Sequence, residues 1–577
     1  MSPTIKQAIY LASALFFVSN ATQAQTVTWN EQVFVIDTLA SNLGYPWEVT
    51  YGPDDSLWVT ESRGYKITKI HAGNGGKRTI LNLQPFKNFS RPDVTGGQWP
   101  QGGLMGLALH PQLLTGKPYV YVAYVYRFDN CLANNNGCFF RTRVVRYTYN
   151  PSNGTLGSPE TILDNLPGSN DHNSGRMTIG PDMKLYYSIG DMGAGQFNNL
   201  NRTNNAQAIN VLEGKVLRLN LEPDEGQSGG DEWIPDDNPF PEGAPATDKT
   251  PVFTYGHRNP QGLVWGNVGG VWRLYSSEHG DKSDDEVNVL EAGKNYGWPK
   301  VAGLCDDNYN TYDPYSANNK LANQDVSSEI ADWCNSNPTV EPIFSMFNWT
   351  GAQLQTTTSN IFTWPTVAPS SIDFYGSYPR TIPGWRNSLL VTSLKHGMFR
   401  LKLVNTDGSR IDSNSTAFTT DTIPYFRGNR VRDVAISPSG DTLYFAIDSS
   451  GNTSGPTGGF DGSGVINTAN AGRILRVVYL ESLPLRDHIP NRPVNNRTVI
   501  KVYPNPTSQF LYVQTKKGLQ KPYRVEMLDM AGKLVHRYVT DKDNFSLDVG
   551  HLTKGIYLFR LYSGLGIPVT TEKIVVQ

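Results

Sequence analysis

The sequence has no long run of charge of either sign and no marked excess of one charge. Lys and Arg total 50 and Asp and Glu total 52 among 577 residues, so the formal net charge is −2. Proteins that bind nucleic acid by electrostatic attraction carry a basic patch or stripe. Because this sequence has neither, nucleic-acid binding is excluded as its function.

Long apolar runs are also missing after the first residues. Residues 8–18 form a short apolar core behind Lys6, and small and polar residues follow up to Ala24. This pattern predicts a cleaved secretion signal at residues 1–24, since its core is too short to span a bilayer comfortably. No later stretch approaches the length of a transmembrane helix. We therefore expect a protein without a transmembrane segment that works outside the cytoplasm.

Cysteine is scarce, with 4 residues and no CxxC spacing. The missing spacing disfavours a zinc site. In the oxidising environment expected for an exported protein, four cysteines favour two disulfides, and their positions pair Cys131 with Cys138 and Cys305 with Cys334. Four free thiols are the alternative.

Glycine, proline and aromatic residues are abundant. The chain has 55 Gly, 37 Pro, 29 Tyr, 23 Phe and 12 Trp, which is typical of all-β folds with many turns and few long helices. About six stretches repeat one pattern, a turn with Pro or Gly followed by an apolar strand. They lie at 52–59, 110–122, 180–187, 269–275, 384–391 and 437–445.

Repeated small sheets predict a six-bladed β-propeller over residues 25–480, in which loops from distant parts of the chain meet over one central channel. Two long insertions, 222–249 and 306–348, would be loops on one face. A pair of β-sandwiches is the competing fold. The chain also exceeds the usual size of a single core, so a further domain is expected.

The last hundred residues differ in composition. Residues 481–498 contain prolines and charges without an apolar period and predict a linker. Residues 499–577 alternate in short strands, at 510–513, 523–527 and 555–561, and predict a small C-terminal β-sandwich. The motifs VYPNP (502–506), GIY (555–557) and EKIVV (572–576) resemble the C-terminal sorting domain of the type IX secretion system. The resemblance implies export through the type IX secretion machinery, with release or attachment at the cell surface.

The stretch from Asp171 to Asp191 places His172 in a loop of small polar residues and ends in a strand closed by Gly190 and Asp191. If the strand returns Asp191 beneath His172, the carboxylate can fix the imidazole ring and leave its other nitrogen as a base. A loop histidine that only makes hydrogen bonds is the alternative.

Polar, glycine-bearing segments beside predicted strand ends are candidates for one shared site. Glycine lets a backbone approach a flat ligand closely, and spaced cations such as Arg258, Lys395, Arg430 and Arg432 would hold several carboxylates or phosphates. Solvated surface loops are the alternative. The segments are 100–106, 171–176, 256–262, 277–281, 364–371 and 430–433.

Together these segments resemble the soluble pyrroloquinoline quinone (PQQ)-dependent glucose and aldose sugar dehydrogenases. The match extends with gaps from about Trp47 to Val478, and its motifs are long and mutually ordered. They are GHRNPQGL (256–263), SDDEVN (283–288), NYGWP (295–299), WPTVAPSS (364–371), LLVTSLK (389–395) and NRVRD (429–433). The family fold is a six-bladed propeller, in agreement with the repeats.

The resemblance implies a role for each matching position. His172 would take the proton of the anomeric hydroxyl while hydride passes to PQQ, Asp191 would orient His172, and Arg258 would stabilise charge on the reduced quinone. Further residues would bind PQQ, namely Gln101, Asn259, Trp364, Thr366, Lys395, Arg430 and Arg432. His279 replaces a family glutamine near the cofactor.

The resemblance also implies calcium, which prefers oxygen ligands. Backbone carbonyls of Gly280 and Asp281 would hold the cofactor calcium, although the best-known relatives carry proline at position 281. A further calcium group would use Asp285, Glu286, Tyr296, Ala302 and Asp306. An ordinary acidic turn at 284–286 is the alternative.

We therefore expect an exported quinoprotein that oxidises an aldose sugar to its lactone. Its partners would be the sugar, an external electron acceptor and the type IX secretion machinery, and a homodimer is one expected assembly. A non-catalytic carbohydrate-binding propeller and a calcium-dependent lactonase are the alternatives. The row of cations favours the dehydrogenase, because a binding module has no need of it and a hydrolase would surround calcium with carboxylates and Asn.

Overall fold

The computed structural model describes most of the chain, in two compact units. One unit spans Gln25–Glu481, and the other holds the described residues from Lys501 onward. The predicted signal (except Ala24), the predicted linker and the cysteines Cys131 and Cys138 lie outside the described residues, so these assignments stay predictions. The described residues are 24–29, 32–87, 100–129, 139–195, 199, 202–224, 231–242, 248–308, 328–346, 348–350, 353, 365–395, 397–412, 429–449, 469–480, 501–515, 521–529, 534–562 and 568–577.

In the described part of the larger unit, six antiparallel sheets follow one another along the chain. The first sheet is β3 (Pro46–Tyr51), β4 (Ser56–Glu61), β5 (Lys66–His71) and β6 (Lys77–Asn82), and the second is β7 (Leu104–Leu109), β8 (Tyr119–Asp129), β9 (Phe139–Asn150) and β10 (Thr155–Ser169). The third is β11 (Met177–Ile179), β12 (Lys184–Ile189), β13 (Lys215–Asn220) and β16 (Val252–Tyr255). The fourth is β17 (Pro260–Val268), β18 (Val271–Glu278), β19 (Asp285–Leu290) and β20 (Phe344–Met346). The fifth is β21 (Pro369–Tyr375), β22 (Ser388–Ser393) and β23 (Gly397–Lys402), and the sixth is β24 (Val431–Ile436), β25 (Thr442–Ile447), β26 (Arg473–Leu480), β2 (Gln32–Ala40) and β1 (Gln25–Trp29).

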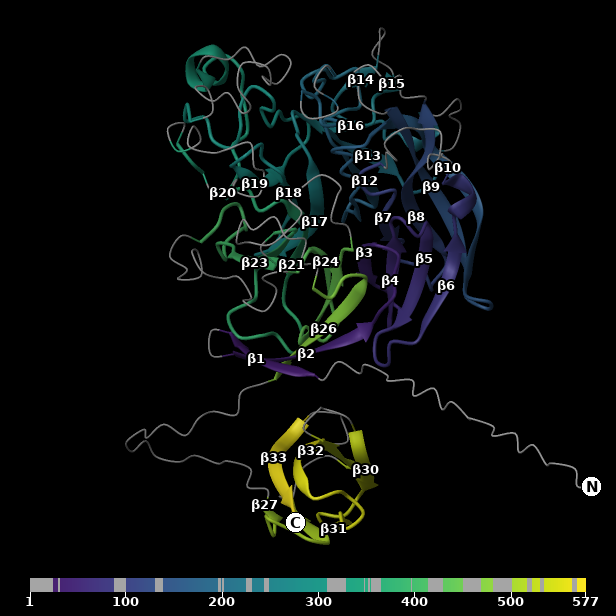
Figure 1. The fold of residues 1–577 in the computed structure, drawn as a ribbon, viewed down its shortest axis with the longest axis vertical. Coiled ribbons are helices and arrows are strands. Elements are labelled where there is room, and N and C mark those ends of the chain that lie inside the picture. Colours follow the sequence, from purple (N-terminus) through teal and green to yellow (C-terminus); the bar gives the residue numbers. More distant parts are fainter. Residues whose placement is uncertain are drawn as a thin grey trace, which may run out of the picture. The chain divides into compact units, whose positions relative to one another are not determined.

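The sheets form a closed ring, which confirms the six-bladed propeller. Each innermost strand contacts the innermost strand of the next sheet, in the order β3, β7, β11, β17, β21, β24 and back to β3. Figure 1 shows most of these strands near the middle of the unit. The ring is closed by β2, which pairs with β26 and so joins the two ends of the unit in one sheet. The six strands that repeat in the sequence are the second strands of the six sheets, β4, β8, β12, β18, β22 and β25.

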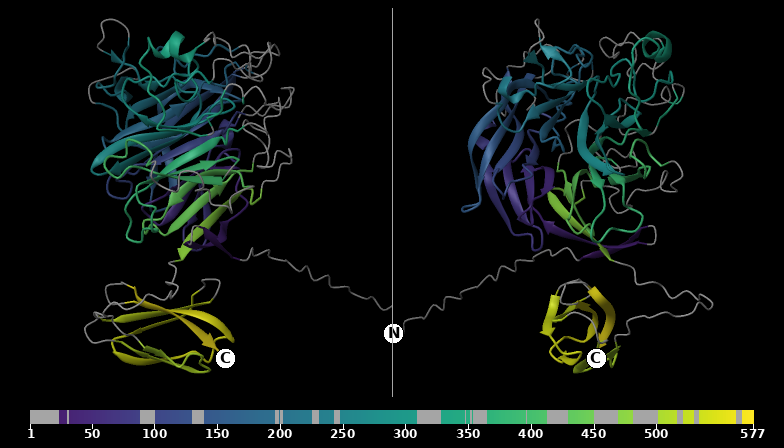
Figure 2. Two further views of the ribbon diagram at one scale, coloured as in Figure 1. Left: turned by 90° about the vertical axis from the view of Figure 1, so that its left-hand side faces the viewer. Right: turned by 180° about the vertical axis from the view of Figure 1, so that it is seen from behind.

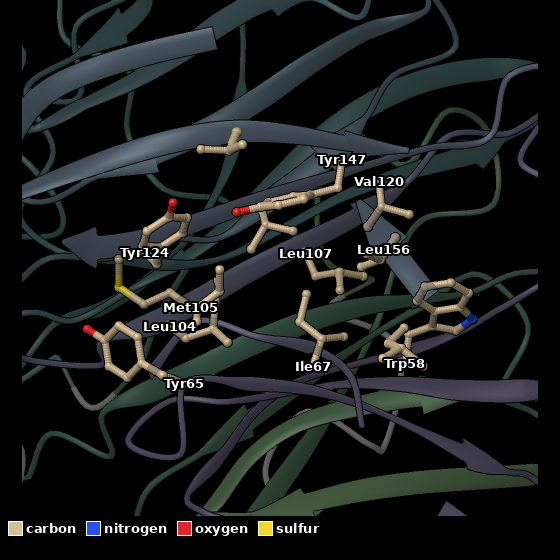
Figure 3. Close-up of a cluster of buried hydrophobic side chains, with 14 of the residues drawn as sticks. Trp58, Tyr65, Ile67, Leu104, Met105, Leu107, Val120, Tyr124, Tyr147 and Leu156 are labelled. Carbon is tan, nitrogen blue, oxygen red and sulfur yellow. The ribbon is translucent and has the colours of Figure 1, made fainter. Parts of the chain in front are cut away.

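Apolar side chains fill the spaces between neighbouring sheets. Between the first and second sheets, Trp58 and Ile67 face Leu107 and Tyr147 in a cluster whose members are almost fully buried (Figure 3). Every residue of β4 is buried, because an inner strand of a propeller packs against a neighbouring sheet on each face. This explains why the second strands are apolar runs that stand out in the sequence.

A buried arginine ties several sheets together at the centre. Arg176 directly precedes β11 and is 2% exposed. Its guanidinium donates to Glu48 Oε2 (2.6 Å), to the carbonyl of Gln261 (2.9 Å) and to the carbonyl of Ser370 (3.0 Å), and lies 3.1 Å from Asp433 Oδ2. These partners belong to four other sheets, so one side chain links five of the six.

The predicted insertions contain some regular structure. Residues 222–249 include the short helix η3 (Asp231–Trp233) and the hairpin of β14 (Pro241–Glu242) and β15 (Asp248–Lys249). Residues 306–348 include the helical turn η4 (Ile330–Cys334) and β20, so the prediction that they are only loop was wrong. Strands of two or three residues are too short to show a period in the sequence. A further helical turn is η1 (Gln84–Phe86), and the predicted Cys305–Cys334 disulfide is present.

The second unit is a small β-sandwich, coloured yellow in Figure 2. One sheet is β27 (Lys501–Tyr503), β28 (Phe510–Gln514) and β31 (Asn544–Asp548), and the other is β30 (Leu534–Thr540), β29 (Tyr523–Asp529), β32 (Gly555–Tyr562) and β33 (Pro568–Val576). Every second residue of β28 and β31 is buried. These side chains pack against those of the second sheet in one core. The predicted strands correspond to β28, β29 and β32.

Candidate active site

Antiparallel pairing brings two kinds of loop to the same face of the propeller. Because the second strand of a sheet runs back along the first, the end of the second strand lies beside the start of the first. Residues just before or at the start of innermost strands include Gln101, His172, Arg258, Asn259, Thr366, Arg430 and Arg432. Residues just after second strands include Asp191, Gly280, Asp281, Lys395 and Asp448.

The predicted pair of His172 and Asp191 is in contact. His172 Nδ1 lies 2.7 Å from Asp191 Oδ1, and the two residues are 4% and 1% exposed. Burial acts to raise the pKa of Asp191, but His172, Arg258 and the Trp298 N–H lower it more, so the net shift is below the usual value. An ionised carboxylate only accepts hydrogen bonds, so Nδ1 is the donor and the lone pair of the neutral ring is on Nε2.

The backbone around this pair is closely fitted. A Cβ at Gly190 would come 2.1 Å from the carbonyl oxygen of His172, so only glycine lets the end of β12 approach the histidine loop. His172 itself has a φ of 51°, in the left-handed region that few residues other than glycine adopt. The loop is held by Gln101, whose Oε1 accepts from the Asn173 N–H (2.7 Å) and whose carbonyl accepts from the Asn173 amide (2.8 Å).

Arg258 lies between an indole ring and a carboxylate. Its guanidinium carbon is 5.3 Å from the ring centre of Trp298, and Nη2 is 3.4 Å from Asp281 Oδ1. Trp298 Nε1 in turn donates to Asp191 Oδ2 (2.7 Å), and the Asp191 N–H donates to the Arg258 carbonyl (2.8 Å). The arginine and the His172 pair therefore form one connected assembly.

His279 and Asn259 lie on the same side of this assembly. Asn259 accepts from the Ser174 hydroxyl (3.0 Å), and its amide nitrogen is 3.4 Å from His279 Nδ1. The pKa of His279 is well below its usual value, first because the ring is buried and then because a positive charge on His172, Arg258 or Arg432 would oppose a second one on this ring. His279 is therefore a neutral polar side chain in a positively charged site.

The four predicted cofactor cations share three neighbouring carboxylates, Asp281, Asp285 and Asp448. Arg430 and Arg432 both pair with Asp448, at 3.2 and 2.5 Å. Burial and the neighbouring Arg432 lower the pKa of Arg430 to about 10 despite Asp448, and burial lowers the pKa of Lys395 to about 8 despite Asp285. Buried cations with depressed pKa values are stabilised by an anionic ligand.

Asp285 organises the loop of Thr366. Its carboxylate accepts from the Thr366 hydroxyl (2.7 and 2.8 Å), from the Val367 N–H (2.5 Å), from the Ala368 N–H (3.2 Å) and from the Gly280 N–H (2.9 Å). Two loops that carry predicted cofactor and calcium residues are thus fixed to one buried side chain. Trp364, the remaining predicted cofactor residue, lies outside the described residues.

The other predicted calcium residues lie near buried carboxylates. Glu286 is opposite Glu278 in the pairing of β18 with β19, and burial followed by repulsion from Glu278 raises the pKa of Glu286 well above its usual value. The Gly303 N–H donates to Glu286 (2.9 Å), and Ala302 N–H donates to Glu329 Oε1 (3.0 Å). Tyr296 stacks on the ring of His257, and Asp306 accepts from the Asn348 amide (2.9 Å).

Several partners in the site were not predicted from the sequence. Trp298 and Asp448 were not assigned roles, and Arg176 and Glu329 were not distinguished from surrounding polar residues. The position of Trp298 within the NYGWP motif is the signal that could have found it. In the described part of the chain, no group of three or more His, Cys, Asp or Glu side chains is arranged to hold a metal by itself.

Comparison with known proteins agrees with this geometry. A family model described as Glucose / Sorbosone dehydrogenase matches residues 43–351 and 349–454. Quinoprotein glucose dehydrogenase B of Acinetobacter calcoaceticus is 35% identical over 490 residues, which cover 79% of this chain and 94% of that protein. Aldose sugar dehydrogenase of Escherichia coli is 26% identical over 454 residues, which cover 77% of this chain and 97% of that protein.

The fold has solved counterparts as well. One is the crystal structure of the soluble aldose sugar dehydrogenase of Escherichia coli in its apo form. It superposes on this chain with a TM-score of 0.51 at 23% identity, and the superposition covers 77% of this chain and 99% of that one. This likeness shows the propeller fold.

The tail also has a matching family. A model described as Secretion system C-terminal sorting domain matches residues 501–577, which assigns the protein to export through the type IX secretion system, to the cell surface or the medium. No helix among the described residues has the length and apolar character needed to cross a membrane. The chain belongs to the glucose/sorbosone dehydrogenase family and carries a C-terminal sorting domain.

Proposed function

We propose that this exported protein oxidises the anomeric hydroxyl of an aldose sugar to the lactone, with PQQ and calcium as cofactors and His172 as the base. The observation that carries the proposal is the His172 ring, which an ionised Asp191 fixes at 2.7 Å beside Arg258 and a group of buried cations. Electrons then pass to an external acceptor.

His172 accepts the proton of the substrate hydroxyl at Nε2. Because Nδ1 donates to Asp191, the lone pair of the neutral ring points to the other side. The imidazolium that forms is stabilised by the negative charge of Asp191, which stays ionised because Trp298 and Asn204 also donate to it, at 2.7 and 3.3 Å. Asp191 therefore has both an orienting and an electrostatic role.

The cations fit PQQ, a flat ligand with several carboxylates. The depressed pKa values of Arg430 and Lys395 support this fit, since the negative charge of a bound polyanion would offset the effect of burial on both cations. When bound, PQQ supplies a quinone that accepts hydride from the substrate carbon. Arg258 would then stabilise negative charge on the quinone oxygen. The rest of the proposed cradle is Gln101, Asn259, Trp364, Thr366 and Arg432.

The carboxylates fit a nearby cation. The raised pKa of Glu286, opposite Glu278, shows buried acidic oxygens with too little positive charge around them. Glu286, Asp306 and the carbonyls of Tyr296 and Ala302 would hold one calcium group, and the carbonyls of Gly280 and Asp281 would hold the cofactor calcium. Asp285, also predicted as a calcium residue, already accepts from four donor groups, so we assign it the role of fixing these loops.

Reconstitution tests the proposal directly. The purified full chain is stripped with EDTA, supplied with PQQ, calcium or both, and assayed with a panel of aldoses for reduction of an artificial electron acceptor. We expect turnover only when both are present. Absence of PQQ-dependent turnover on every sugar, with the protein folded by circular dichroism, would overturn the enzyme assignment.

A matched pair of variants assigns the base. His172→Ala should keep PQQ binding and lose turnover. His110→Ala removes another buried histidine, one that accepts from the Gln112 N–H away from the site, and should keep both. The homodimer also stays a prediction, which light scattering on the full chain tests.

A further inference from the structure

Asp281 is a buried carboxylate with only half of its hydrogen-bonding capacity in use. It follows β18, is 4% exposed, and its Oδ1 lies 3.4 Å from Nη2 of Arg258. Its Oδ2 is buried and has no hydrogen-bond partner among the described residues. Its negative charge therefore acts chiefly on the guanidinium beside it and less strongly on Lys282 and His172.

A quinone is not a direct partner for this carboxylate. Quinone oxygens and carboxylate oxygens both accept hydrogen bonds, so neither can satisfy the other. Arg258, in contrast, donates to both kinds of group. A carboxylate at 3.4 Å competes with the quinone oxygen for the positive charge of the same guanidinium.

We propose that Asp281 sets the midpoint potential of the bound quinone cofactor by offsetting part of the positive charge of Arg258. The inference rests on the proposed function, because it concerns PQQ in this site. Negative charge on the quinone oxygen increases on reduction, so a weaker Arg258 favours the oxidised form and lowers the potential. Asp281 acts through Arg258 and is a positioning and charge-setting residue.

The size of the effect follows from the removal of one nearby charge. An opposite charge within about 4–6 Å shifts the protonation equilibrium of a group by about 1–3 pKa units. The proposed quinone would contact Arg258 and not Asp281 itself, so we take the lower end of this range and expect Asp281→Asn to change the ratio of the affinities for reduced and oxidised cofactor by about tenfold. For a two-electron couple, a tenfold change corresponds to about 30 mV, here toward higher potential.

The test is a spectroscopic redox titration of the full chain with bound PQQ and saturating calcium. It is done at pH 8 for every variant, so that all potentials are compared at one pH. Asp281→Asn should raise the potential, and Asp281→Glu, which keeps the charge, should leave it near that of the wild type. Asp373→Asn is the matched control, since Asp373 is not among the residues assigned to the cofactor or to calcium and lines a cavity of about 590 Å³ that contains the β3–β4 turn.

The outcomes separate this inference from the proposed function. If the wild-type chain binds no PQQ, the proposed function fails. If it binds PQQ and Asp281→Asn has the wild-type potential, or the same change as Asp373→Asn, the charge-setting role is wrong. If Asp281→Asn instead weakens PQQ binding in a way that excess calcium restores, the carboxylate is a calcium ligand and the role through Arg258 is overturned.

Discussion

Replacing Asp191 with asparagine tests whether this carboxylate sets the proton state of His172. Both oxygens of Asp191 act as acceptors. Oδ1 accepts from His172 Nδ1 (2.7 Å) and from the Gly193 N–H (2.9 Å), and Oδ2 accepts from Trp298 Nε1 (2.7 Å) and from the Asn204 amide (3.3 Å). An amide of the same shape has an oxygen, which accepts, and an NH₂ group, which donates. Its NH₂ group therefore faces two of these donors at one end.

The site responds differently to the two amide orientations. If the amide oxygen faces Trp298, the amide NH₂ faces Nδ1, and the ring can accept there only by carrying its proton on Nε2, where it no longer acts as a base. If the oxygen faces His172, the N–H of Trp298 is left without an acceptor in a buried place, which costs roughly 1–3 kcal/mol. Either way the carboxylate charge that stabilises an imidazolium is gone.

Loss of base catalysis sets the expected magnitude. A positioned general base contributes typically about 10²–10⁴ in rate. At about 1.4 kcal/mol per factor of ten, this corresponds to roughly 3–5 kcal/mol of transition-state stabilisation. We expect Asp191→Asn to lower turnover by about this factor and to lower the melting temperature, while PQQ affinity stays close to that of the wild type.

The assay is single-turnover reduction of the bound cofactor by a saturating aldose, followed by stopped-flow absorbance. Residues that act as a unit give strongly non-additive losses, so the double variant with His172→Ala should be no slower than His172→Ala alone. Wild-type turnover in Asp191→Asn would refute the reasoning. A loss that multiplies in full in the double variant would show that Asp191 acts independently of His172.

Three further changes have defined outcomes. His172→Ala should keep PQQ affinity in a fluorescence titration and lose about two to four powers of ten in turnover, and unchanged turnover would remove His172 from its role. Burial raises the pKa of Asp373 from 3.8 to about 7, so the wild type loses stability as pH rises through this range. Asp373→Asn should therefore raise the melting temperature at pH 8 but not at pH 4, and an equal shift at both would contradict this cause. Cys305 and Cys334 are 29 residues apart, so replacing both with serine should lower the free energy of unfolding by about 3–4 kcal/mol in a denaturant titration, and a reductant should not destabilise that variant further.

The central strands of the propeller were predictable from the sequence, and its outer strands were not. Every residue of β4 and of β22 is buried, and a turn rich in glycine or proline precedes each. Outer strands lack this signal. Four of the six residues of β6 are exposed, and β20 has only three residues. The number of blades could therefore be counted from the second strands alone, while the insertions were assigned as loops.

The contact between His172 and Asp191 was predictable because one short hairpin, β11 and β12, connects the two residues. β12 carries the chain from the loop of His172 back to Asp191, a separation of 19 residues. Trp298, which also holds Asp191, lies 107 residues further on in the segment between β19 and β20, and local sequence patterns do not report such contacts. The same holds for Asp448, whose pairing with Arg430 and Arg432 depends on the turn after β25.

The contacts that were hardest to predict from the sequence are those by which Arg176 links the candidate site to the centre of the propeller. Neighbouring blades touch mainly through apolar side chains, which fix their distance more firmly than their angle. Arg176 adds directional bonds, because its planar guanidinium donates in fixed directions to partners on separate sheets. Its acceptor Gln261 uses the carbonyl for Arg176 and Oε1 for Arg432, at 2.9 and 2.8 Å, so the position of Arg432 depends on the arginine at the centre. Glu48 and Asp433 share that arginine, and burial together with Asp433 raises the pKa of Glu48 despite the opposing charge of Arg176. The Arg176 guanidinium is thus held in place by the charges of two buried carboxylates. Because Arg176 ends the His172 loop and shares Gln261 with Arg432, it fixes the positions of this loop and of Arg432 relative to each other.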